Sequence, residues 1–107
     1  MSWHVEILDR RVELELDELA ADIRQRFAHT VKLIESYGLL AMREPHIKHL
    51  EGKLWEMRMR GKDGIGRAIY VTVREERVVV VHAFTKKSQR TPSRSLKIAR
   101  ERAKEVK

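Results

Sequence analysis

Three strand-length segments follow one another between residues 54 and 84, and only short turns separate them. Apolar and charged side chains alternate through 54–60, which is the two-residue period of a strand that buries one face. A tip with three glycines, residues 61–66, leads into a return strand over 67–74. The acidic pair at 75–76 then turns the chain into 77–84, whose four consecutive valines indicate a strand covered on both faces. The pattern predicts a three-stranded antiparallel meander.

The residues before this meander have the periodicity of one strand and two helices. Residues 3–8 alternate apolar and polar side chains and predict a short strand. Asp9 is a suitable N-terminal cap for a short helix that runs to about Leu19. Apolar residues at three- and four-residue intervals predict a second helix over 20–37, and Gly38 follows where a C-terminal cap belongs.

Two further stretches complete the predicted order. Residues 39–53 are irregular, and Pro45 argues against a helix, so we expect a connector there. Near the C-terminus, Ser93 or Ser95 can begin a closing helix with a narrow apolar stripe. We therefore predict a single α+β domain over residues 1–107, with an N-terminal strand, two helices, the antiparallel three-stranded meander and a C-terminal helix.

Size and composition exclude several classes of protein. A chain of 107 residues forms one modest core and has no room for a large substrate cavity. It contains no cysteine, which removes disulfide scaffolds, cysteine nucleophiles and thiolate metal sites. No apolar run approaches the ~18 residues of a membrane span, and the first residues lack the apolar centre of a signal peptide. We expect a cytoplasmic protein with no membrane partner.

The positive charge of the chain is concentrated in its second half. Residues 1–53 carry eight Lys or Arg and ten Asp or Glu, whereas residues 54–107 carry fifteen and six. The net charges are therefore −2 and +9. A basic surface of this strength attracts polyanions, with nucleic acid first and acidic protein surfaces second. The alternative is a solvated surface that only keeps the protein soluble.

The usual enzyme motifs are missing from the sequence. The glycines of 61–66 lie between two strands and lack the following Lys-Ser or Lys-Thr of a phosphate-binding loop. His46 and His49 could both approach a metal ion, but no third ligand is evident. Pro45 also argues against a helix that would present both side chains on one face. We expect neither a metal site nor a cofactor.

Cationic side chains on the predicted sheet are the remaining candidates for chemistry. Arg58 and Arg60 share a face with Glu56, so a salt bridge within the strand explains part of the set without any function. Several elements nevertheless converge on one side of the meander, and a concave basic surface there could bind an RNA phosphate and stabilise a pentacoordinate transition state. RNA supplies its own nucleophile, the 2′-hydroxyl, so such a site needs neither metal nor cysteine. The converging residues are Lys48, Arg58, Arg60, Arg67, Lys86 and Lys87, with His82 near the end of the central strand.

Three motifs in this region resemble one known family, the RelE/HigB-type toxins and in particular their phage-derived branch. Residues 50–58, Leu-Glu-Gly-Lys-Leu-Trp-Glu-Met-Arg, resemble its Leu-x-x-x-Leu-Trp-Glu-Leu-Arg signature. Residues 67–70 match its Arg-x-x-Tyr strand, and residues 84–92 match its Phe-x-Lys-Lys-x-x-x-x-Pro segment. The resemblance covers nearly the whole chain and keeps the predicted order of elements.

This resemblance implies a microbial-RNase-like α+β fold and a specific activity. The protein would be the toxin of a type II toxin–antitoxin pair that cleaves mRNA in the ribosome without metal and so inhibits translation. Its partners would be the ribosome, mRNA and a cognate antitoxin of the helix-turn-helix type. Two alternatives stay open: a gyrase-inhibiting toxin of the related ParE branch, and a non-catalytic RNA- or protein-binding module on the same scaffold.

The resemblance also suggests roles for individual residues. Arg58 and Arg67 correspond to strand arginines that bind phosphate and stabilise the transition state. Lys86 matches the basic position after the last strand, and Lys48 lies where related toxins often place a catalytic lysine or histidine. His82 is a candidate acid or base without an assured counterpart, and no tyrosine follows Tyr70, so the identity of the acid and base stays open. Residues expected to bind RNA are Arg60, Lys87, Gln89 and Arg90.

Overall fold

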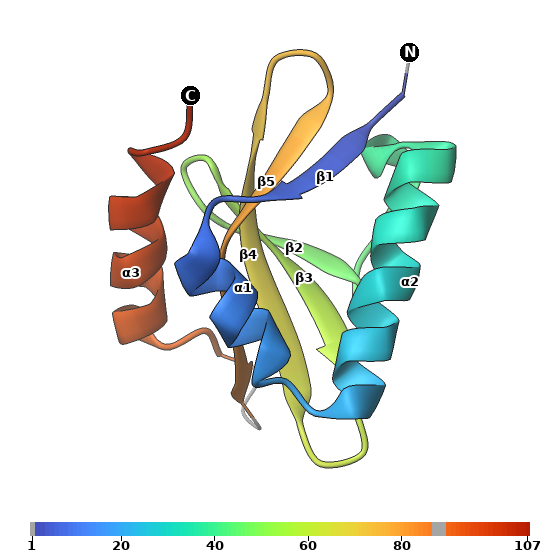
Figure 1. Cartoon of the computed structure of the whole chain (residues 1–107), viewed down its shortest axis with the longest axis vertical. Coiled ribbons are helices and arrows are strands. Elements are labelled where there is room, and N and C mark those ends of the chain that lie inside the picture. Colours follow the sequence, from blue (N-terminus) through green and yellow to red (C-terminus); the bar gives the residue numbers. More distant parts are fainter. Residues whose placement is uncertain (1, 87–89) are drawn as a thin grey trace.

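The computed structural model describes residues 2–86 and 90–107, shown in Figure 1. The predicted RNA-binding residues Lys87 and Gln89 lie outside the described residues. In chain order the elements are β1 (His4–Ile7), α1 (Arg10–Asp17), α2 (Ala21–Tyr37), the short 3-10 helix η1 (Leu39–Ala41), β2 (Ile47–Glu51), β3 (Leu54–Arg60), β4 (Ile65–Val73), β5 (Arg77–Lys86) and α3 (Ser93–Ala103).

The strands form one mixed sheet in the order β1-β5-β4-β3-β2. The neighbours β2–β3, β3–β4 and β4–β5 are antiparallel, which confirms the predicted meander of the last three strands. β1 runs parallel to β5 at the edge of the sheet opposite β2, and α1, α2 and η1 connect β1 to β2. The α+β fold class is therefore as predicted.

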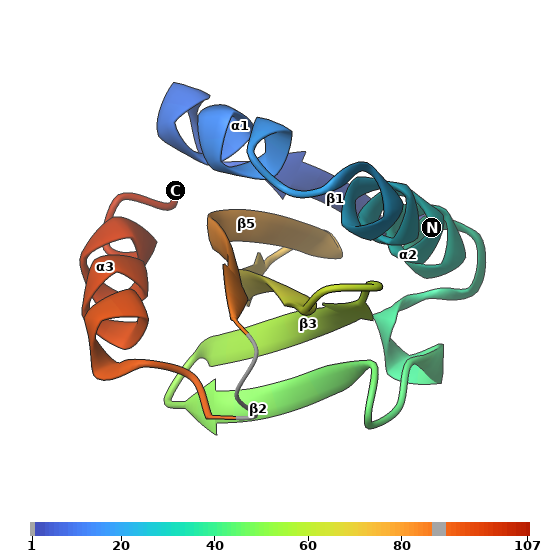
Figure 2. The same cartoon turned by 90° about the horizontal axis from the view of Figure 1, so that it is seen from below.

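Helices cover both faces of the sheet. α1 and α2 lie on one side and α3 lies on the other, as Figure 2 shows. Val78 and Val80 pack with the first helices in one core cluster, whereas Val79 and Val81 pack toward α3 in a second. The four valines of β5 thus fill two cores at once, which confirms the prediction of a strand buried on both faces.

Both predicted N-terminal helices form, with the expected ends. The carboxylate of Asp9 accepts a hydrogen bond from the backbone N–H of Arg11 at 3.0 Å and caps α1. Ile23 and Ile34 bury the apolar stripe of α2 in the first core. Gly38 ends α2 with a φ of 88°, a backbone conformation that favours glycine.

The expectation of a strandless connector over 39–53 is wrong, because this stretch contains η1 and the edge strand β2. Two features hide the strand in the sequence. Its residues include Lys48 and His49, so apolar alternation is absent, and the pairing register with β3 shifts between His49 and Glu51. The sheet therefore has five strands, one more than the predicted elements supply.

The glycine-rich tip is also shorter than predicted, because β4 begins at Ile65 rather than at Arg67. Gly66 is a strand residue that lies directly beneath Ile23 of α2. A Cβ atom at this position would clash with the Cγ2 methyl group of Ile23. The glycine thus serves close packing of helix on sheet, which a turn interpretation of 61–66 does not foresee.

Within residues 2–86 and 90–107, no helix combines the length and the apolar character that crossing a membrane demands.

Candidate nucleic-acid interface

The strand register brings most of the predicted site residues to one face of the sheet. Side chains directly opposite each other on paired strands project from the same face, as do residues two apart in one strand. Ile69 places this face on the side of α3, because it belongs to the core cluster that packs against that helix. The cross-strand rows are Lys48–Glu56–Ile69–His82, then Arg58–Arg67–Phe84, then Arg60–Ile65–Lys86. We refer to Lys48, Arg58, Arg60, Arg67 and Lys86 as the cation face.

A buried carboxylate organises the middle of the cation face. Glu56 is fully buried, and its Oε1 atom accepts a hydrogen bond from Nε of Arg58 at 2.7 Å. Its Oε2 atom accepts another from the hydroxyl of Thr91, just before α3, at 2.8 Å. The predicted salt bridge within β3 is therefore present. Because Glu56 is anchored from two directions, it fixes where the Arg58 side chain lies.

Arg67 lies beneath the surface of this face, fully buried on β4 and opposite Arg58. Burial lowers the pKa of Arg67, the Glu56 carboxylate opposes that shift, and the positive charge of Arg58 adds to it. The guanidinium therefore contributes positive potential from below the sheet surface. By contrast Lys48, Arg60 and Lys86 are exposed, and so is Arg90 after the last strand.

His82 belongs to a separate cluster at the outer edge of β5. Its Nδ1 atom lies 3.1 Å from Oε1 of Glu15, and its ring stacks on Phe84 with a centroid distance of 5.1 Å. The same Oε1 atom accepts hydrogen bonds from Nη1 of Arg102 at 2.9 Å and from the backbone N–H of Ala83 at 3.1 Å. This carboxylate thus joins α1, β5 and α3.

The environment of Glu15 favours its charged form. Burial raises the pKa of this carboxyl, but the hydrogen bonds from His82, Arg102 and the Ala83 backbone outweigh burial and lower the pKa to about 2. His82 is 6% exposed and packed within this cluster. The structure therefore places the predicted acid–base candidate in a role that holds three elements together.

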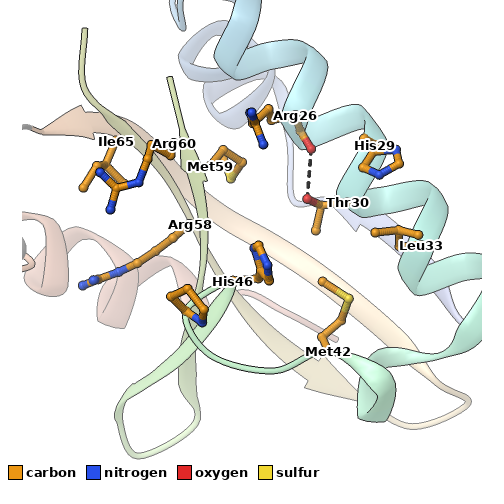
Figure 3. A pocket seen from close by; sticks show the side chains of 11 residues that line it. Arg26, His29, Thr30, Leu33, Met42, His46, Arg58, Met59, Arg60 and Ile65 are labelled. Carbon is orange, nitrogen blue, oxygen red and sulfur yellow. Dashed lines mark hydrogen bonds between the residues drawn. The ribbon is translucent and has the colours of Figure 1, made fainter. Parts of the chain in front are cut away.

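A cavity of about 430 Å³ adjoins the cation face where β3 continues beyond its pairing with β2. It lies between α2, the segment before β2, and β3, as Figure 3 shows. The backbone carbonyl of His46 accepts a hydrogen bond from the N–H of Arg58 at 2.8 Å and closes this corner. The lining residues are Arg26, His29, Thr30, Leu33, Met42, Pro45, His46, Arg58, Met59, Arg60 and Ile65. We call it the α2 cavity.

Comparison with known proteins places the chain in a family. The profile of the family described as phage-derived protein Gp49-like (DUF891) matches residues 14–104. The chain belongs to the Gp49-like family. Among curated proteins, none matches the sequence significantly.

Solved structures show which fold this Gp49-like chain has. A free-state structure of a mutant of the E. coli toxin RelE aligns over 100% of both chains, with a TM-score of 0.65 and 16% identity. The archaeal RelE–RelB complex from Pyrococcus horikoshii OT3 covers 79% of this chain and 96% of that chain, with a TM-score of 0.58 and 24% identity. At this identity the likeness concerns the fold, which is that of RelE. The predicted fold and phage-derived branch are confirmed.

Sequence reasoning missed part of the basic surface of the Gp49-like chain. Arg26 and His29 lie three residues apart on α2 and so share a helix face, but no motif connects them with the distant sheet. His46, considered above only as a metal ligand, lines the α2 cavity, whereas His49 contacts Trp55 with a ring-centroid distance of 4.9 Å. The two histidines therefore face different surroundings.

Proposed function

We propose that this Gp49-like chain is the toxin of a type II toxin–antitoxin pair and cleaves mRNA in the ribosome without a metal ion. The observation that supports the proposal most directly is the continuity of the cation face with the α2 cavity through Arg58 and Arg60. Five cationic or titratable residues line that cavity: Arg26 and His29 from α2, His46 before β2, and Arg58 and Arg60 from β3. A bent RNA strand carries one phosphate per nucleotide, and such a surface accommodates it.

The proposed chemistry is attack of the RNA 2′-oxygen on the neighbouring phosphorus. The new O2′–P bond forms while the P–O5′ bond breaks, so a base must take the 2′ proton and an acid must supply one to the leaving 5′ oxygen. Arg58, held by Glu56, is positioned to stabilise the additional negative charge of the phosphorane. His46 and His29, which line the cavity, are the acid and base candidates that this arrangement favours.

The test is induced expression in a bacterial host, with mapping of mRNA 5′ ends in the presence and absence of translation. The proposal expects growth arrest and new 5′ ends inside translated frames, which disappear when translation is blocked. Arg58→Ala should abolish both effects. Arg74→Ala, which removes an exposed arginine beyond β4 and outside the three rows, is the matched control and should stay fully toxic. Arrest with intact mRNA would overturn the nuclease proposal and favour the gyrase alternative.

The proposed partner is a cognate antitoxin, expected to be a helix-turn-helix protein, and the proposed location is the cytoplasm. Support comes from the P. horikoshii protein of the same fold, which was solved as a RelE–RelB complex. Coexpression of the protein encoded beside this chain should restore growth and form a complex that survives gel filtration. Failure of every neighbouring product to restore growth would contradict this part of the proposal.

A further inference from the structure

A second hollow, of about 470 Å³, lies on the α1–α2 side of the sheet, between Trp3, η1, the segment before β2 and strands β3 and β4. Its walls carry large apolar side chains that remain in contact with water: Leu40 is 83% exposed and Trp55 is 37% exposed. Apolar side chains gathered in one concave surface are typical of a binding site. The lining residues are Trp3, Leu39, Leu40, Met42, Arg43, Glu44, Ile47, Trp55, Tyr70 and Thr72. We call it the tryptophan groove, because it is lined by both tryptophans of the chain.

The floor of the groove contains a polar group that the fold leaves unsatisfied. Tyr70 lines the groove and is fully buried, and its hydroxyl has no hydrogen-bond partner among the described residues. A buried hydroxyl without a partner destabilises a fold, because the hydrogen bonds it made to water are not replaced. The groove therefore has features that folding alone does not explain: exposed apolar walls and an unsatisfied hydroxyl beneath them.

The tryptophan groove and the α2 cavity are neighbours. Met42 lines both of them, so one continuous ligand can pass from the groove across this side chain into the cavity. The two hollows differ in chemistry. The groove is mainly apolar, whereas the cavity presents Arg26, Arg58 and Arg60. A ligand that fills both needs an apolar surface beside an acidic one.

We propose that the tryptophan groove and the α2 cavity together bind one acidic amphipathic segment of a protein partner. Its apolar side chains would cover Leu40 and Trp55, and its carboxylates would reach Arg26 and Arg60 across Met42. The inference rests on the proposed function for identifying this partner as the antitoxin. On that basis the bound segment occupies cations that the RNA also needs, so the two ligands exclude each other.

Charge and shape favour a protein segment over the other possible occupants. Two tryptophans could stack on RNA bases. However, the remaining walls include the aliphatic residues Leu39 and Leu40, which offer a nucleotide neither an aromatic ring to stack on nor a hydrogen bond. A second copy of this chain is also disfavoured, because each copy carries a net charge of +7 and like charges repel. An acidic partner benefits from the same charge.

The two tryptophans make the proposal directly measurable, because all tryptophan emission of the protein comes from the groove. The probe is a synthetic peptide in which leucines recur every third or fourth residue and glutamates fill the other positions. We expect a saturable blue shift of the emission when this peptide covers the groove. A peptide with lysines in place of the glutamates should bind at least tenfold more weakly, because it meets the same arginines.

Two protein variants test where the peptide binds. Leu40→Ser should weaken binding about tenfold or more, because a leucine side chain gains roughly 1.5–3 kcal/mol when it is fully covered. Leu14→Ser is the matched control: Leu14 is 47% exposed on α1, outside the groove, and its replacement should leave binding unchanged. Arg60→Ala should weaken binding and reduce its dependence on salt.

Several results would overturn the inference. In the peptide titration, an absent or non-saturable shift of the emission would do so, as would equal binding of the lysine peptide. An effect of Leu14→Ser equal to that of Leu40→Ser would show that the peptide does not bind at the groove. A blue shift caused by protein concentration alone would mean self-association. A larger shift with an RNA oligonucleotide that Leu40→Ser abolishes would assign the groove to RNA. Because fluorescence requires no toxicity, peptide binding without mRNA cleavage would refute only the proposed nuclease. Cleavage without peptide binding would refute only the groove.

Discussion

Replacing Glu56 by glutamine removes the negative charge that lies among the arginines of the cation face while keeping the size of the side chain. Glu56 is fully buried, and only 12% of the Arg58 side chain is exposed. The buried guanidinium of Arg67 lies close enough for the same carboxylate to act on it. The variant therefore removes a negative charge that acts on both guanidinium groups in a poorly solvated region, and the stability of the fold should fall.

The size of this loss follows from the burial of the pair. Removing one partner of a buried ion pair costs about 3–5 kcal/mol, and because Arg58 keeps some contact with water we expect about 3 kcal/mol. A useful comparison is Glu51→Gln, which breaks a pair of the same chemistry with Arg100. There the side chains are 41% and 49% exposed. Such an exposed pair contributes roughly 0–1 kcal/mol.

Urea unfolding followed by circular dichroism measures both variants against the unaltered protein. With an m-value of about 1.5 kcal/mol/M, the unfolding midpoint should fall by about 2 M for Glu56→Gln and by less than about 0.7 M for Glu51→Gln. Equal losses for the two variants would refute the reasoning, because burial would then not determine the contribution of the carboxylate. An unchanged m-value for both variants verifies that the compared unfolding reactions are the same.

Three further predictions concern single side chains. The pKa of Glu15 is lowered to about 2 in the folded protein. Its stabilising contribution is therefore present above about pH 4.5 and is lost as the pH falls toward 2. Glu15→Gln should flatten this part of the stability–pH curve, and an unchanged curve would contradict the assigned cluster. Tyr70→Phe removes an unsatisfied buried hydroxyl and should leave the melting temperature equal or higher, so a clear drop would show that the hydroxyl has a partner. Gly66→Ala should cost about 1–3 kcal/mol through the clash with Ile23. In denaturant unfolding, the double variant with Ile23→Ala should lose less than the two single losses combined, whereas additive losses would argue against the clash.

The helices and strands whose apolar side chains recur at a regular interval could be predicted from the sequence. The meander, both N-terminal helices and the closing helix follow from side-chain periods of two and of three to four residues, and Asp9 and Gly38 mark ends that the structure confirms. β2 was not predicted, because it is an edge strand whose polar residues and shifted register remove the alternation of apolar and polar side chains. Gly66 was assigned to the turn because close packing against Ile23, far away in the sequence, leaves no local signal.

For the site, the sequence located the cations of the sheet but not what surrounds them. The spacing of Glu56 and Arg58 predicts their salt bridge, and the motif of β3 gives the strand that carries it. The burial of Arg67 and the bond between Glu56 and Thr91 depend on how α3 approaches the sheet, which one sequence does not encode locally. Likewise, His82 looked available on the strand, but Glu15 of α1 reaches it only in the folded chain.

The two outer edges of the sheet differ in whether side chains of the helices bind their backbone N–H groups. Along the β1–β5 edge, side-chain carboxylates take up backbone N–H groups that another strand could otherwise bind: Glu35 accepts from Val5 and Glu15 accepts from Ala83, both at 3.1 Å. At the opposite edge, β2 has no strand beyond it among the described residues. An unprotected edge invites pairing with a foreign strand. Strand addition, whether in a productive complex or during aggregation at high concentration, is therefore directed to β2, beside the α2 cavity.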